Sequence, residues 1–342
     1  MTCSGPGLTR RRRGKRWEYL DPNGMPITDE AVIARADALV LPPAWRDVWI
    51  CQLPMGHIQA TGIDARGRRQ YRYHDQWRMQ QDASKFDRAL DFAERLPAAR
   101  VTVSGHLAEP GLTRDRVLGC AFRLLEMGFF RIGSEEYAET NKTYGLATMR
   151  RDHVSVSRQG VISFDYVAKS GKRRQQELAD ADVLAVVGAL KRRRGGGDEL
   201  LAYRTRTGWA DIRSADVNAY LRQVTGGDYT AKDFRTWNAT VLAAVGLAVS
   251  TYAAATPTAR TRAVTRVVKE VADKLGNTPA VCRASYIDPR VIDRYQNGET
   301  IIEVVEDLGD GMSFGQLATH GPIELAVLGL LRDPAALRRA AS

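Results

Sequence analysis

Residues 275–289, LGNTPAVCRASYIDP, place a tyrosine where it could act as a nucleophile. Gly276 can end one helix in the left-handed conformation, and Thr278, with the proline after it, can begin another. Tyr286 falls on this short second helix, with Arg283 one turn back on the same face. A free tyrosine has a pKa near 10, so only about one in a thousand is ionised at neutral pH and a nucleophilic phenol needs cations nearby. The alternative is that Tyr286 packs in a core.

Three cationic residues elsewhere in the chain fall at predicted element boundaries. Arg131 lies in a tight connection between a helix ending near Gly128 and a helix begun by Ser134. Lys169 ends a strand beside a glycine-containing turn, and Arg235 lies on the first turn of a helix, where a cation opposes the dipole. Two of them have a plain alternative: Arg131 could be a surface partner of a helix end, and Lys169 a solvated turn residue.

The composition points to a basic protein that meets polyanions. Lys plus Arg number 50 and Asp plus Glu number 40, a net charge of +10, with basic clusters at residues 10–16 and 191–194. The four cysteines show neither paired metal spacing nor a disulfide pattern, so we expect reduced thiols in a cytosol. No apolar run approaches the roughly 20 residues of a membrane span, and no apolar stretch of a secretory signal follows the basic start.

The positions of turn and helix-boundary residues predict an α+β protein in three parts. Residues 1–16 are expected to form a disordered basic arm, which either contacts nucleic acid or is only a solvated tail. Residues 17–82 carry turn signals and alternating runs at 49–53, 57–63 and 68–74, which indicate a small β-rich domain. Residues 83–342 are mainly helical, beginning with a helix that Ser84 could cap.

The strand at residues 68–74 interleaves cations with aromatic side chains. With a period of two, Gln70 faces one way, while Arg69, Tyr71 and Tyr73 face the other. Such a surface suits a grip on a nucleic-acid backbone that also touches bases. An ordinary amphipathic strand with its tyrosines in the core remains the alternative.

Helix caps and turns organise the larger domain. Helices are expected to start at Thr113, Ser214 and Thr230, the last with Asp233 three residues on as a capping box. Residues 153–167 predict a β-hairpin, with a second turn directly after it that holds Lys169. An apolar helix near residues 323–331 is expected to serve packing.

Taken in order, the fragments FFRIGSEEYAETNKTYG, FDYVAKSGK, YTAKDFRTW and LGNTPAVCRASYI, with GRRQYRYH before them, give the chain a family resemblance. It resembles the type IB DNA topoisomerases of the small, poxvirus-like and bacterial kind, over roughly residues 17 to 310. The resemblance implies a small N-terminal β-sheet domain and a larger, mainly α-helical catalytic domain with a β-hairpin, the fold shared with tyrosine recombinases.

The resemblance also implies roles for individual residues. Tyr286 would attack a DNA phosphodiester and keep the 3′ phosphate, while Arg131 and Arg235 would clamp the non-bridging oxygens. Lys169 would protonate the departing 5′ oxygen. Asn277 stands where the poxvirus-type enzymes have a histidine; an amide can donate a hydrogen bond there but carries neither a charge nor a proton to give.

Further expectations concern DNA contacts and cofactors. Four residues match family positions that touch DNA: Gln70, Tyr71, Tyr73 and Tyr137. The implied activity is relaxation of supercoiled duplex DNA by a monomer acting as a clamp, in the cytoplasm on a bacterial nucleoid. No cofactor or metal is expected, since the phosphotyrosine keeps the ester energy, GxxxxGK[ST] is absent and the five histidines are scattered.

Two other functions remain open at this point. A tyrosine recombinase uses the same transesterification, but it characteristically has a His-x-x-Arg box, where this chain has Lys232-Asp233-Phe234-Arg235. A DNA-binding protein without catalysis would require the combination of Tyr286 with three cations to be a coincidence.

Overall fold

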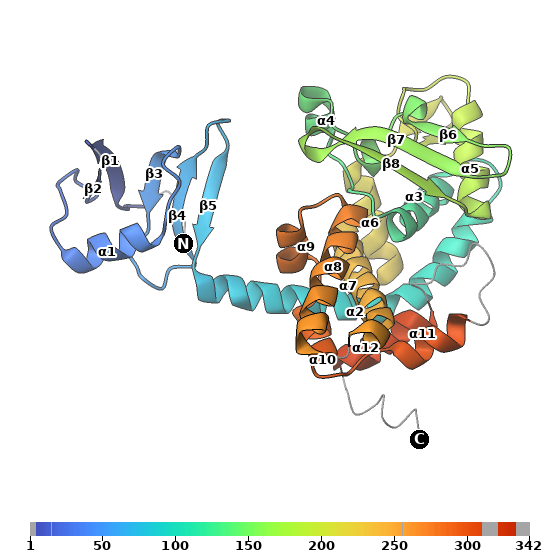
Figure 1. Cartoon of the computed structure of the whole chain (residues 1–342). Coiled ribbons are helices and arrows are strands. Elements are labelled where there is room, and N and C mark those ends of the chain that lie inside the picture. The colour runs from blue at the N-terminus through green and yellow to red at the C-terminus, as the bar shows by residue number, and fades with distance from the viewer. Residues whose placement is uncertain (1–4, 15, 255, 310–320, 333–342) are drawn as a thin grey trace. The chain divides into compact units, whose positions relative to one another are not determined.

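The computed structural model of the protein describes residues 5–14, 16–254, 256–309 and 321–332. The chain divides into two compact units, Met1–Lys85 and Phe86–Ser342 (Figure 1). The division lies close to the domain boundary expected between residues 82 and 83. Among the helices of the described ranges, none is both long and apolar enough to cross a membrane.

The described residues of the first unit form two small antiparallel sheets, one short helix and the beginning of a long helix that continues into the second unit. Its elements are β1 (Thr9–Arg13), β2 (Arg16–Leu20), α1 (Glu30–Ala38), β3 (Arg46–Ile50), β4 (Ile58–Ile63) and β5 (Arg69–Tyr73). β1 pairs with β2, and the other sheet has the order β3–β4–β5. Strands were expected near all three members of this second sheet, whereas α1 was missed; Asp29 caps α1 by accepting from the backbone of Ala31 and Val32.

The expected disordered arm is wrong for the described residues of its range. Thr9–Arg13 forms β1, because its charges find partners on β2. Glu18 accepts from both Arg11 and Arg13, and the guanidinium carbon of Arg10 lies 4.0 Å from the ring centroid of Trp17. These contacts give three of the cations a partner on the neighbouring strand, although the run keeps a net positive charge. Residues 1–4 and 15 lie outside the described residues.

The long helix α2 (Asp75–Leu107) begins nine residues before Ser84, the expected cap. Its first residue, Asp75, accepts from Arg72 at 2.8 Å, and an acidic first turn suits the positive end of a helix. Ser84 is therefore an interior helical residue, and α2 starts in the first unit and continues into the second.

The second unit is mainly helical and also carries small sheets. Its further helices are α3 (Arg114–Gly128), α4 (Glu135–Asn141), α5 (Ala181–Arg192), α6 (Ser214–Thr225), α7 (Ala231–Ser250), α8 (Pro257–Leu275), α9 (Pro279–Ser285), α10 (Pro289–Gln296), α11 (Ile302–Gly309) and α12 (Pro322–Arg332). The helix starts expected at Thr113, Ser214 and Thr230 are confirmed to within a residue.

Helix α7 runs through the core of this unit. Phe234 meets Phe92 of α2 and Phe122 of α3 edge-to-face, with ring centroids 4.8 and 5.0 Å apart. Trp237 is fully buried, and its indole N–H donates to Glu324 of α12 at 2.7 Å. The packing role expected for the helix near residues 323–331 is thus confirmed, since α12 closes the core over α7.

A three-stranded antiparallel sheet lies beside these helices (Figure 1). Its strands are β6 (Val154–Val156), β7 (Ile162–Ala168) and β8 (Lys172–Leu178), and a two-stranded hairpin follows later in β9 (Ala202–Arg204) and β10 (Trp209–Asp211). The predicted hairpin is confirmed as β6 and β7. The edge strand β8 was missed because its sequence, KRRQQEL, is almost entirely polar.

Candidate active site

A cavity of about 320 Å³ in the second unit collects residues that are distant in sequence. Four of the five expected catalytic residues line it: Arg131, Lys169, Arg235 and Tyr286. They come from the α3–α4 connection, the β7–β8 turn, the first turns of α7 and the end of α9. No local pattern in the sequence could show this convergence.

Tyr286 is held by its backbone at the end of α9. Thr278 caps this helix as expected, and the Tyr286 N–H donates to the carbonyl of Cys282 at 3.0 Å. The Thr240 hydroxyl of α7 donates to the Tyr286 carbonyl at 3.3 Å and accepts from the N–H of Asp288 at 3.1 Å. Tyr286 therefore follows the last residue of the helix instead of lying within it, and α7 fixes its place.

Arg235 is buried beneath the tyrosine, with 4 % of its surface exposed. It donates to the carbonyls of Phe129 and Leu275, the latter at 2.8 Å, and its guanidinium carbon lies 5.2 Å from the ring centroid of Tyr286. Burial, and then the nearby charge of Arg131, lower the pKa of Arg235 to about 10. The side chain stays a cation at neutral pH and faces the phenol.

Arg131 leaves α3 after Phe129, which takes a left-handed conformation with φ 52°. Its Nη2 donates to the side-chain oxygen of Asn277 and lies 3.5 Å from the carbonyl of Gly276. Asn277 does not line the cavity; it lines an adjoining groove of about 750 Å³. Its Nδ2 is buried and has no hydrogen-bond partner among the described residues.

The two arginines outweigh burial at the phenol. Burial by itself raises the pKa of Tyr286. The charges of Arg235 and Arg131 together lower this pKa by more than burial raises it, so the net shift is downward. The cavity therefore favours the phenolate, the form in which tyrosine is a nucleophile.

Lys169 opens the short turn Lys169–Gly171 between β7 and β8. Its side chain is exposed and lines the cavity. Ser170 in the same turn has φ 67°, a left-handed conformation that a serine adopts at some cost. The turn thus presents an amine to the cavity from an exposed tip.

Of the residues expected to touch DNA, Tyr137 of α4 lines the cavity. The other three lie on β5 in the first unit. Tyr71 and Tyr73 stack with centroids 6.0 Å apart, on one face of the strand as the alternation predicted. Gln70 donates to Asp64 at 2.9 Å. Trp77, at the start of α2, stacks on Tyr73 at 4.6 Å and was not foreseen.

Sequence reasoning also missed two residues that line the cavity, Tyr144 and Lys232. Each lies within a fragment that carried the resemblance, so the sequence contained a signal that could have identified both. Arg283, expected to accompany Tyr286, is exposed and does not line the cavity.

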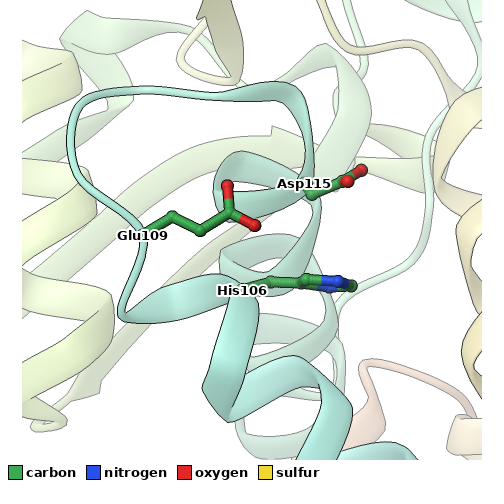
Figure 2. A group of neighbouring side chains, drawn as sticks. All are labelled: His106, Glu109 and Asp115. Atoms are coloured by element: carbon green, nitrogen blue, oxygen red, sulfur yellow. The ribbon is translucent and has the colours of Figure 1, made fainter.

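Three possible metal ligands lie together at the corner where α2 passes into α3: His106, Glu109 and Asp115 (Figure 2). Their ligand atoms are all within 4.8 Å of one another. His106 Nδ1 is 2.7 Å from the hydroxyl of Tyr220, and Glu109 accepts from Thr113. None of the three lines the Tyr286 cavity, so the chemistry of that cavity does not involve them.

The chain matches known protein families along most of its described length. The family model described as "Eukaryotic DNA topoisomerase I, catalytic core" matches residues 74–306, and that described as "Bacterial DNA topoisomerase IB, N-terminal domain" matches residues 16–64.

Individual relatives agree with these matches. The chain is 29 % identical to a protein named DNA topoisomerase 1B of Acanthamoeba polyphaga mimivirus, over 88 % of this chain and 91 % of the relative. It is 26 % identical to DNA topoisomerase 1 of Daucus carota, over 38 % of this chain and 15 % of the relative. It is 27 % identical to DNA topoisomerase 1 of Candida albicans, over 47 % of this chain and 20 % of the relative. The chain therefore spans a small part of these last two relatives.

Proposed function

The chain belongs to the type IB DNA topoisomerase family, and from this premise we propose that Tyr286 is the residue that cleaves one strand of duplex DNA. The phenolate oxygen attacks a phosphodiester phosphorus and forms a tyrosine–phosphate bond to the 3′ side of the break. The bond to the 5′ oxygen breaks, and that oxygen takes a proton. The observation that carries the proposal is the convergence of Arg131, Lys169, Arg235 and Tyr286 on one cavity.

The two arginines act on the phosphate. Their guanidiniums donate to the non-bridging oxygens and stabilise the negative charge that grows there in the transition state. Both already flank the phenol, which reduces the reorganisation needed when DNA arrives. Asn277 adds an N–H donor through Nδ2, which has no partner in the described part of the chain, and it transfers no proton.

Lys169 acts on the leaving group. A 5′ alkoxide is a strong base, so protonation as it departs is worth roughly 10² to 10⁴ in rate. In religation the same amine accepts the proton back while the 5′ hydroxyl attacks the phosphotyrosine. One ester replaces another in each direction, so the cycle as proposed draws on the DNA's own supercoiling and routes no step through a nucleotide or metal.

We propose further that the protein works as a monomer that clamps duplex DNA, with surfaces from both units. The stacked tyrosines of β5 support a DNA-facing role for the first unit, and the net charge of +10 supports contact of the whole chain with a polyanion. The match of residues 16–64 to a bacterial domain supports the nucleoid of a bacterial cytoplasm as its place of action.

Replacement of Tyr286 by Phe tests the central step. We expect Tyr286→Phe to lose plasmid relaxation and the covalent adduct trapped by denaturant, while it still binds DNA non-covalently, because only a hydroxyl is removed. Tyr252→Phe, at a tyrosine with 68 % exposure, is the matched control and should relax DNA normally. Normal relaxation by Tyr286→Phe, or an adduct mapped by mass to another peptide, would refute the assignment. Strand exchange between two defined sites would indicate a recombinase instead.

A further inference from the structure

The C-terminal end of α8 gathers three arginines from three other elements. The last carbonyls of a helix lack intrahelical donors and form the negative end of its dipole, so cations are favoured there. Here three successive carbonyls each receive one guanidinium. The pairs are Arg174 with Lys274 at 2.8 Å, Arg235 with Leu275 at 2.8 Å and Arg131 with Gly276 at 3.5 Å.

Two of these arginines belong to the proposed phosphate clamp, but Arg174 does not line the cavity. It lies on β8 opposite Tyr166 of β7 and reaches away from the sheet to α8. Its Nη2 also donates to Gln176 at 3.0 Å. The contact with α8 is close: a β-carbon on Gly276 would lie 2.4 Å from Arg174 Nη1.

Arg174 thereby connects the hairpin of Lys169 to the segment that leads to Tyr286. The turn that carries Lys169 is exposed throughout, so its position depends on the strands that flank it. β8 is the edge strand of its sheet and pairs with β7 alone in the described sheet. A bond from β8 to the end of α8 therefore limits how far the hairpin can move from the phenol.

We propose that Arg174 is a positioning residue for the general acid, and this inference depends on the role proposed for Lys169. Proton transfer needs the amine within about 2.6–3.2 Å of the departing oxygen. Arg174 holds β8 against the end of α8, where Arg131 and Arg235 are also bound. The general acid, the phosphate-binding arginines and the nucleophile are therefore all positioned by this helix end. Without Arg174, Tyr286 and the two clamping arginines stay in place, but the amine of Lys169 occupies a wider range of positions.

The neighbouring Arg173 supplies a matched control. It carries the same charge on the same strand, but it faces outward and pairs with Asp165 of β7. Its side chain is 69 % exposed, whereas Arg174 is half-buried. Comparison of the two alanine variants separates the anchor from the general effect of a lost charge.

The experiment measures single-turnover cleavage of two suicide substrates. One has an ordinary phosphodiester, and the other has a 5′-bridging phosphorothiolate, whose thiolate leaves without help from an acid. We expect Arg174→Ala to slow cleavage of the ordinary strand at least about 10-fold, part of the full general-acid effect, and to cleave the phosphorothiolate at close to the wild-type rate. Arg173→Ala should resemble the wild type on both, and Arg174→Lys should fall between.

Lys169→Ala, run in parallel, separates the two hypotheses. Equal slowing of both substrates by Lys169→Ala would end the general-acid role and this inference with it. Suppose instead that the phosphorothiolate restores the cleavage rate of Lys169→Ala. If Arg174→Ala then slows cleavage of both substrates equally, or of neither, the role of Arg174 is overturned and that of Lys169 stands. If the alanine variant unfolds, Arg174→Gln is assayed on both substrates; it keeps an N–H donor but is too short to reach the end of α8, so we expect it to behave as Arg174→Ala does.

Discussion

At the residue scale, the side-chain amide of Asn277 has a hydrogen-bond partner for its oxygen but none for its nitrogen among the described residues. Its oxygen accepts from Arg131, while its Nδ2 is buried without a partner among the described residues. A buried donor left unpaired costs about 1–3 kcal/mol, which an incoming phosphate oxygen would relieve. In the proposed mechanism, the amide would hold Arg131 and donate to a phosphate oxygen at the same time.

Replacement by an isosteric carboxylate separates these two tasks. Asn277→Asp still accepts from Arg131 but can no longer donate to a phosphate, and it brings a negative charge near one. We expect cleavage to slow by roughly 10² to 10³, the usual effect of losing one oxyanion donor. A 5′-phosphorothiolate substrate should not restore the rate, because the loss is not at the leaving group. Restoration would show that Asn277 serves the leaving oxygen.

The charges around Tyr286 predict how its titration responds to mutation. Arg235 and Arg131 lower the pKa of the phenol against the effect of burial. Removal of one positive charge should therefore raise this pKa and reduce the phenolate fraction at neutral pH. The difference in ultraviolet absorbance between each protein and its Tyr286→Phe counterpart reports the titration. The midpoint should move to higher pH in Arg131→Gln, and an unchanged or lower midpoint would contradict the electrostatic account.

At the element scale, Gly276 joins α8 to the catalytic segment under two constraints. It has φ 64°, and Arg174 occupies the space where a side chain would begin. Gly298, just after α10, has φ 84° with nothing within 4 Å of its would-be β-carbon. Gly276→Ala and Gly298→Ala should both lose about 1–2 kcal/mol of unfolding free energy from the left-handed backbone.

Only the Gly276 variant should also lose activity. Its new methyl group must displace Arg174 and the backbone that leads to Asn277, so single-turnover cleavage should slow while Gly298→Ala cleaves normally. Chemical denaturation measures the first effect and cleavage of a suicide substrate the second. Equal activity in the two variants would mean that the end of α8 does not position the site.

The elements that could be predicted from sequence are those with local stop and start signals. Thr113, Thr278 and the Thr230–Asp233 capping box each mark a boundary within a few residues of chain. β1 and β8 could not be found in this way, because their charged residues pair only through contacts with other segments. The candidate catalytic residues came from the family resemblance, and the cavity that joins them exists only in three dimensions.

At the scale of the whole molecule, the excess of positive charge predicts that DNA binding depends strongly on salt. Each phosphate contact contributes about −0.9 to the slope of log K against log salt. Within the first unit, Arg69→Ala should make this slope less steep by about 1, whereas Tyr71→Ala should weaken binding at every salt concentration and leave the slope unchanged. Both residues lie on one face of β5, so the pair compares charge with stacking at one place. Equal slopes for wild type and Arg69→Ala would remove β5 from the phosphate-binding surface.

The arginines bound to the end of α8 have a consequence for turnover. Without DNA, the carbonyls of Leu275 and Gly276 supply partial negative charge beside Arg235 and Arg131, so the two cations can stay close together despite their mutual repulsion. Because these carbonyls hold the guanidiniums beside the phenol in the absence of DNA, an arriving phosphate meets two cations that are already in place. The end of α8 thus stabilises the pair of cations between one cleavage event and the next, as a small bound anion would.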